Sequence, residues 1–382
     1  MPSASRRAVT WLATTGRGVP VRLEVAFEFR GKAMDATADS LFTMMGMKKA
    51  RVLVLFDTDA EPAAAQDYNL ARTVKLGGEG GWDYPAVDGA ARRVYVSRGS
   101  HVMVLDADTL QVVGDLPETP GVHGIAIAGE LGKGFTSNGR ADTLTVFDTK
   151  TLKATGEVKT GANPDAILYD LFTQRVFAFN GRSGDVTVVD AKSGAVAATI
   201  PIGGKLEFGQ TDGKGQVFVN VEDKNEIVAL DAKQMKVLAH WPIAPCEEPS
   251  GLALDTAHRR LFAVCGNKLM AVVNADTGQV VTTLPIGAGT DGAAFDPATQ
   301  NAFSSNGEGT LTVVHESAPD KFEVVQTVKT QRSARTVALD PKTGRLLMPA
   351  AELGPPPAPT PEQPRPRPTL VPGSFALVVV SR

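Results

Sequence analysis

A short apolar strand that ends in a polar residue recurs along this chain at a nearly constant interval. The polar end residues are 42, 42, 41, 43 and 41 positions apart, and they are Asp106, Asp148, Asp190, Asp231, Asn274 and His315. A second set of strand ends is spaced by 40 to 44 positions and consists of Asp88, Ala128, Asp170, Asp212, Asp255, Asp296 and Asp340. Two independent markers with one period indicate a true structural repeat, which constrains the fold more than any other feature.

Each repeat unit contains four short strands and no helical pattern of comparable length. In the fifth unit, Asp255–Arg259 and Asn274–Gly278 have the composition of turns, and they separate strands expected at Gly251–Leu254, Arg260–Val264, Lys268–Val273 and Val280–Leu284. Four strands in a unit of about 42 residues are typical of one blade of a β-propeller.

The unit count predicts seven blades, of which the last is one strand short. Thr336–Leu339, Arg345–Met348 and Phe375–Val380 supply three strands of this blade. Leu70–Leu76 precedes the first inner strand without a partner of its own, and joining it to the last blade would close the ring. We therefore predict an all-β fold over residues 67–382: a seven-bladed β-propeller of four-stranded antiparallel blades, closed by an N-terminal strand.

The seventh unit is lengthened by a proline-rich insertion at residues 351–374, in which 9 of 24 residues are proline. Proline lacks a backbone donor, so this composition predicts polyproline II or irregular structure. A lid over one face, a ligand for a proline-reading partner and an ordinary surface loop all agree with it.

Residues 1–66 form an N-terminal extension without repeat character. Within it, residues 47–65 resemble a degraded secretory signal, with a basic start at Met47–Arg51 and a small-residue site at Ala63–Ala65. The apolar core between them, Val52–Phe56, is shorter than a working signal requires. We favour export to the periplasm or the extracellular space; if this segment is not a functional signal, the location is cytoplasmic.

The charge balance limits the partners. Lys and Arg total 39 against 42 Asp and Glu, the formal net charge is −3, and aromatic residues make up 6% of the chain. These values speak against nucleic-acid binding. No apolar run approaches the roughly 18 residues of a membrane span, so we predict no membrane-spanning segment. We also expect the protein to be a monomer.

Both cysteines, Cys246 and Cys265, fall in the fifth unit, and their number excludes a disulfide-dense scaffold. If the first two strands of this unit pair, Cys265 lies opposite Ser250, four residues from Cys246. A disulfide between them is our working hypothesis, and it would fit an oxidising compartment.

The second strands of the units share an apolar start followed by small polar residues. Examples are Val94-Tyr95-Val96-Ser97, Phe135-Thr136-Ser137-Asn138, Phe177-Ala178-Phe179-Asn180, Phe218-Val219-Asn220 and Phe303-Ser304-Ser305-Asn306. Over residues 70–382 this pattern resembles the Tyr-Val-Thr-Asn consensus of the YVTN-type β-propeller repeat family, which includes the YncE-like proteins of bacteria. The resemblance implies an exported protein with a binding or surface role; single-stranded DNA binding occurs in the family, and propellers with similar repeats include lactonases.

The loops that enter the inner strands of a propeller converge on one mouth of its central channel, the funnel face. Counting five residues back from the second set of strand ends gives seven polar residues, here called the ring: Asp83, His123, Asp165, Glu207, Ser250, Asp291 and Arg335. The ring is either a wet channel mouth or a binding site. Four carboxylates against one arginine favour a cation, an amine or a polar metabolite, with Ca²⁺ as one candidate, and they disfavour a polyanion.

The loops after the second strands are expected on the same face. They add Asn138, Arg140, Asn180, Arg182 and Asn306 as candidate ligand-binding residues. The Asn-Gly pairs are first of all hairpin-turn signals, whereas the two arginines could clamp an anionic group.

No motif of a known catalytic class is present, so whether this protein is an enzyme stays open. The sequence predicts a module without a resident cofactor that binds a small polar ligand, a cation or a protein partner at the funnel face. A lactonase-type hydrolase is the alternative, with Glu207 or Asp165 as base and His123 or Arg335 as electrophile. Single-stranded DNA binding is a second alternative.

Overall fold

The computed structural model describes residues 7–14, 20–27, 67–318, 320–360, 366 and 368–382. The chain divides into two compact units, Met1–Gln66 and Asp67–Arg382. In the first unit, β1 (Arg7–Thr14) pairs with β2 (Pro20–Phe27) as an antiparallel hairpin. The signal-like segment at residues 47–65 lies outside the described residues.

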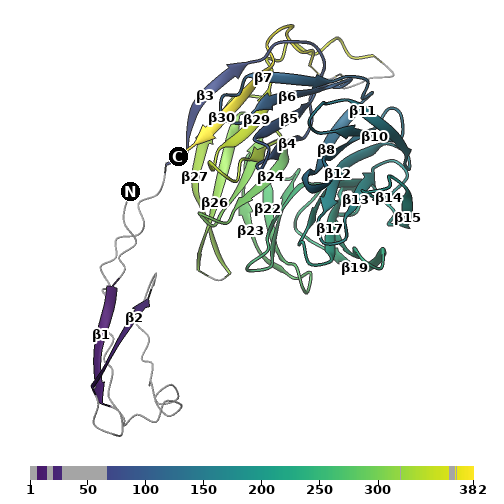
Figure 1. Cartoon of the computed structure of the whole chain (residues 1–382). Helices are drawn as coiled ribbons and strands as arrows, with labels where there is room; N and C mark the ends of the chain where they lie inside the picture. The colour runs from purple at the N-terminus through teal and green to yellow at the C-terminus, as the bar shows by residue number, and fades with distance from the viewer. Residues whose placement is uncertain (1–6, 15–19, 28–66, 319, 361–365, 367) are drawn as a thin grey trace. The chain divides into compact units, whose positions relative to one another are not determined.

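The second unit is a ring of seven four-stranded sheets, which confirms the predicted fold (Figure 1). Each of the first six blades consists of four strands that are consecutive in the sequence. Blade one contains β4 (Pro85–Asp88), β5 (Arg93–Ser97), β6 (Val102–Asp106) and β7 (Val112–Leu116); blade two contains β8 (Val122–Ala128), β9 (Lys133–Asn138), β10 (Thr143–Asp148) and β11 (Ala154–Lys159); and blade three contains β12 (Pro164–Asp170), β13 (Arg175–Asn180), β14 (Asp185–Asp190) and β15 (Val196–Pro201). Blade four contains β16 (Leu206–Thr211), β17 (Gln216–Val221), β18 (Glu226–Asp231) and β19 (Lys236–Pro242); blade five contains β20 (Pro249–Asp255), β21 (Arg260–Cys265), β22 (Leu269–Asn274) and β23 (Val280–Pro285); and blade six contains β24 (Thr290–Asp296), β25 (Asn301–Asn306), β26 (Thr310–Ala318) and β27 (Lys321–Lys329). In the part of the chain that the structure describes, the helices are two 3₁₀ turns, η1 (Gly129–Leu131) and η2 (Glu222–Lys224), and neither has the length or hydropathy to cross a bilayer.

The seventh blade joins both ends of the propeller. Its strands β28 (Ala338–Leu339), β29 (Leu346–Ala350) and β30 (Ala376–Ser381) are completed by β3 (Asn69–Lys75), which pairs antiparallel with β30. Most side chains of β3 are exposed, so main-chain hydrogen bonds hold it in the sheet. Tyr68, just before β3, is buried and packs edge-on against Phe303 of blade six, with 5.1 Å between ring centroids. The predicted closure is therefore confirmed, with an anchor on a second blade.

The repeated apolar position of the second strands fills the seams between blades. It is the third residue of each of these strands in blades one to six, and its side chains are 0 to 1% exposed: Tyr95, Phe135, Phe177, Phe218, Phe262 and Phe303. Burial of one large apolar side chain stabilises the fold by about 1.5–3 kcal/mol. The repeat thus encodes one such contribution per blade.

Ion pairs cross several of the seams on the face opposite the funnel. Arg92 of blade one lies 2.7 Å from Asp340 of blade seven, and Arg259 of blade five lies 2.9 Å from Asp212 of blade four. Burial alone would raise the pKa of Asp340, but hydrogen bonds from Arg92 and Thr343 lower it to about 2. The strand-end aspartates therefore help to hold neighbouring blades together.

Two further features concern the loops. Cys246 and Cys265 form a disulfide with a Cα–Cα distance of 5.7 Å, as hypothesised from the sequence. The base of the proline-rich insertion is tied by a bridge between Leu353 and Leu370, whereas residues 355–360 are exposed. The disulfide thus fixes the loop that enters β20, next to the ring residue Ser250.

Deleting residues 1–76 is expected to lower the free energy of unfolding by about 3 kcal/mol or more, because it removes the hydrogen bonds of β3 and leaves an open edge. Deleting residues 1–66 should change it by less than about 1 kcal/mol. Tyr68→Ala in the full chain should cost about 3 kcal/mol through its lost contact with Phe303. Urea unfolding of the three proteins measures this, and equal stability of the two truncations would exclude β3 as the closing strand.

Candidate functional site

The structure brings all seven ring residues to one cavity of about 500 Å³ at the funnel face. In five blades the ring residue is the second residue of the inner strand, and these are His123, Asp165, Glu207, Ser250 and Asp291. The pairing with the next strand shifts register beside each of these five positions. A β-bulge re-aims a side chain and frees it from the ladder, so the same local irregularity turns each ring residue toward the channel.

Four ring residues form a connected network on one side of the cavity. The Nδ1 of His123 lies 2.6 Å from Asp83 Oδ2, and Arg335 donates to Asp83 Oδ1 at 3.3 Å. Arg335 also donates from Nε to Asp291 Oδ2 at 2.7 Å. Burial alone would lower the pKa of His123, but its bond with Asp83 and the nearby aspartate charges raise it. The positive charges on this side are thus already paired.

Tyr84 reaches from blade one across the ring to blade four. Its side chain is buried, its ring lies 4.8 Å from that of Phe208, and its hydroxyl donates to Glu207 at 3.5 Å. Burial and the surrounding carboxylates raise the pKa of Tyr84 well above its ordinary value, so it remains a neutral donor. At blade four, Lys205 pairs with Glu207 at 2.8 Å and with Glu222.

Asp165 differs from the other acidic ring residues because its carboxylate accepts no hydrogen bond from any residue that the structure describes. Its nearest cation is His123, with Nδ1 3.6 Å from Oδ1, and its side chain is 14% exposed. Burial, and then the charge of Asp83, raise the pKa of Asp165 to about 6. Burial and the charge of Asp165 likewise raise the pKa of Glu207. The cavity therefore holds acidic groups that lack enough positive charge nearby.

The cavity as a whole has an excess of carboxyl groups. It is lined by six of them against two permanent cations, Lys205 and Arg335, and the six are Asp83, Asp165, Glu207, Glu222, Glu248 and Asp291. Donor atoms of Asp83, His123 and Asp165 all lie within 4.8 Å of one another, close enough to share one metal ion. This arrangement can attract and hold a cation.

Six further residues line the cavity without having been predicted from the sequence as site residues: Tyr84, Lys205, Glu222, Glu248, Gly266 and Thr290. Most of them lie in the same loops that were expected at the funnel face. Glu222 follows the second strand of blade four, where other blades have an Asn-Gly pair, and Lys205 lies two residues before Glu207. Their position in these loops is the sequence signal that places them at the funnel face.

The expectation that three asparagines face the ligand is corrected by the structure. Asn138, Asn180 and Asn306 are buried, and none of them lines the cavity. Each binds hydroxyl groups of the adjacent strand, as when Asn138 Nδ2 donates to Thr145 Oγ1 at 2.8 Å. These side chains satisfy polar groups inside their blades, and each asparagine is the last residue of its strand, so that the turn begins after it.

The two candidate arginines also lie outside the cavity lining. Arg140 and Arg182 are both exposed on their loops. The predicted clamp for an anionic group therefore does not form part of this cavity.

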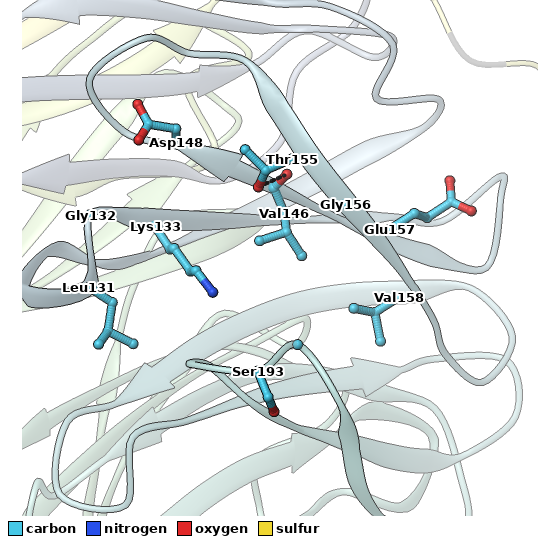
Figure 2. A pocket seen from close by; sticks show the side chains of 11 residues that line it. Leu131, Gly132, Lys133, Val146, Asp148, Thr155, Gly156, Glu157, Val158 and Ser193 are labelled. Carbon is cyan, nitrogen blue, oxygen red and sulfur yellow. Dashed lines mark hydrogen bonds between the residues drawn. The ribbon is translucent and has the colours of Figure 1, made fainter.

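A second cavity, of about 370 Å³, lies between blades two and three (Figure 2). Two of its charged side chains already serve the fold. Asp148 accepts hydrogen bonds from Thr151 within its own turn, and Lys133 donates to main-chain oxygens of the facing turn. The funnel cavity, with its excess of carboxyl groups, is therefore the better candidate site.

The fold and the cavity together define a seven-bladed β-propeller with a polar funnel. A comparison with protein-family models found no match, and a comparison with curated proteins found none either. Among solved structures, "Structure of U3-55K" aligns with a TM-score of 0.67 and 8% identity, over 82% of this chain and 98% of that chain. A chain of "Crystal Structure of Mitotic Checkpoint Complex" aligns with a TM-score of 0.62 and 15% identity, over 79% and 95%. At these identities the likeness shows the fold alone, and the YVTN-type family stays a prediction.

Asp165→Asn is expected to stabilise the protein above pH 6. Because the folded-state pKa of Asp165 is raised to about 6, the ionised carboxylate destabilises the fold increasingly from about pH 4 upward, and fully above pH 6. The variant should therefore gain about 1–3 kcal/mol at pH 8 and almost nothing at pH 4. Urea unfolding at both pH values measures the gain. Ser250→Ala, at an uncharged ring position, is the control, and a gain of equal size at both pH values would contradict this explanation.

Proposed function

We propose that this protein is a binding module whose funnel cavity takes up a small cationic ligand, in the first place a metabolite that carries an ammonium group. The excess of carboxyl groups in the cavity supports this proposal, and above all Asp165, whose carboxylate has only a 3.6 Å contact with His123 and accepts no hydrogen bond from the described residues. Arg335 is already paired with two aspartates, and Lys205 with two glutamates. A cavity of about 500 Å³ has the size of a small-molecule site.

A metal cation is the second form that this ligand could take. The close donors of Asp83, His123 and Asp165 include one imidazole nitrogen, whereas Ca²⁺ prefers oxygen ligands. The ammonium ligand is therefore our first choice, and Ca²⁺ is tested beside it.

The hydrolase alternative has less support in the geometry. The Asp83–His123 pair resembles a general base oriented by a carboxylate. However, a Cβ atom added to Gly139 would lie 2.7 Å from His123 Nε2, so this nitrogen packs beside the backbone of blade two. A base that faces the backbone is poorly placed to take a proton from a substrate.

The acidic lining also disfavours single-stranded DNA, which is a polyanion.

Export and membership of the YVTN-type family belong to the same proposal. A buried disulfide between Cys246 and Cys265 supports an oxidising compartment, because such bonds are rare in the cytosol. Fractionation of the native host tests the location, and recovery of the protein in the cytosol with two free thiols would contradict export.

Binding of a simple diamine such as 1,4-diaminobutane should strengthen about tenfold or more between pH 5 and pH 7, because burial raises the pKa values of Asp165 and Asp291, and these carboxyls must lose their protons to hold the cation. The double variant Asp165→Asn with Glu207→Gln should lose binding at both pH values. Isothermal titration calorimetry measures both effects, and mass spectrometry of what co-purifies with the natively expressed protein identifies the natural ligand. Unchanged affinity in the double variant would place the site elsewhere.

Arg335→Ala distinguishes two kinds of ligand. For a bare cation or a diamine the affinity should rise, since a fixed positive charge leaves the cavity. For a ligand that also carries a carboxylate, affinity should fall by about 2 kcal/mol, roughly thirtyfold. Arg140→Ala, an exposed arginine outside the cavity, is the matched control and should change neither affinity.

A further inference from the structure

A second cluster of metal-ligating side chains lies at the seam between blades five and six. Asp255 ends β20, His258 lies in the turn that follows, and Glu316 belongs to β26. Because β20 runs from the funnel end at Ser250 to its far end at Asp255, the cluster lies on the face opposite the funnel. The Nδ1 of His258 is 2.7 Å from Asp255 Oδ2 and 3.2 Å from Glu316 Oε2.

Both carboxylates of this cluster are buried, but they differ in their partners, because the backbone N–H groups of Ala257 and His258 donate to Asp255 Oδ1. Both side chains are 3% exposed. An imidazole nitrogen carries at most one proton, and the short contact with Asp255 uses it. The Oε2 of Glu316 accordingly has no hydrogen-bond partner among the described residues. A buried carboxylate oxygen in this state is unfavourable unless a cation neutralises it.

The repeat shows how this seam differs from two of the others. At two other seams the strand-end aspartate binds an arginine of the next blade, as Asp212 binds Arg259 and Asp340 binds Arg92. The corresponding residue of blade six is Gln300, which is neutral. The strand-end aspartate of this seam therefore has no arginine at the position of Arg92 and Arg259, and the arginine at this seam, Arg260, pairs with Asp320 instead.

Glu316 is itself an exception in the repeat. Its backbone N–H donates to the carbonyl oxygen of Gln300, the residue just before the preceding strand. In four other blades the equivalent backbone hydrogen bond is made by a buried alanine, and these are Ala107, Ala191, Ala232 and Ala275. His258 takes the position of Thr173, Thr299 and Thr343, whose hydroxyls donate to their own strand-end aspartates. At this seam a neutral residue at position 300 is thus combined with an additional carboxylate and an imidazole, and both of these are metal-ligand types.

We propose that Asp255, His258 and Glu316 bind a divalent transition-metal ion, with Zn²⁺ as the ion that their chemistry fits best. Imidazole and carboxylate are both zinc ligands, and with three protein ligands water would supply the fourth. Neighbouring ligands of a tetrahedral zinc ion lie about 3.3 Å apart, close to the observed 3.2 Å between His258 and Glu316. His258 is 41% exposed and gives the ion access from solvent. The bound ion would join blade five to blade six.

The test is a Zn²⁺ titration of the full chain, freed of metal with a chelator, and of its variants. Because the funnel cluster around His123 could also bind zinc, the titration is done in the His123→Ala background as well. A site should remain in that background, and His258→Ala and Glu316→Gln should each weaken it more than tenfold. His240→Ala is the matched control, since His240 pairs with a single carboxylate, Glu226, and should leave zinc binding unchanged.

Glu316→Ala gives a second and stricter test, because it restores the residue that four other blades have at this position. This variant should unfold at a higher temperature than the metal-free original protein, yet should lose the rise of about 5 °C that Zn²⁺ at a hundredfold excess over its Kd is expected to produce. Equal zinc binding by the original protein, His258→Ala and Glu316→Ala would overturn the proposal. Tighter binding of Ca²⁺ than of Zn²⁺ at this seam would also overturn it.

Discussion

The pairing of β3 with β30 is the interaction on which the rest of the propeller depends. Each blade buries its two faces against its neighbours, so an open seam would expose apolar surface on both sides. The region of closure is reinforced by Arg98, whose buried guanidinium lies 3.4 Å above the ring of Phe375 and donates to the main-chain oxygen of Glu79. This contact fastens the loop between β3 and β4 to the last blade. The geometry of the funnel therefore depends on contacts made well outside it.

Much of this architecture could be predicted from the sequence, because the repeat converts position along the chain into position in space. The inner strands of most blades have the same length and the same bulge, so an offset of five residues from the strand end reaches the funnel each time. For the same reason the missing strand of the last blade could be assigned to Leu70–Leu76, which the structure places as β3 at Asn69–Lys75.

The direction of individual side chains could not be predicted in this way. The period shows that Asn138 lies in a funnel-facing loop, but Thr145 on the adjacent strand decides that its amide turns into the blade. The contact of Tyr84 with Glu207 joins blades that are far apart in sequence, and no local pattern indicates it. At the seam of blades five and six the unusual residues are visible in the repeat, whereas their convergence requires the packed blades.

Tyr84 has a mechanical consequence for the ring. A circle of seven blades can distort toward an ellipse through small rotations at each seam, and such a distortion would change the spacing between opposite funnel residues. Tyr84 packs in one buried cluster with Ala166 of blade three and Leu206 of blade four, although it belongs to blade one. It therefore acts as a brace across the diameter of the ring, and it keeps the carboxylates of opposite blades at a fixed separation.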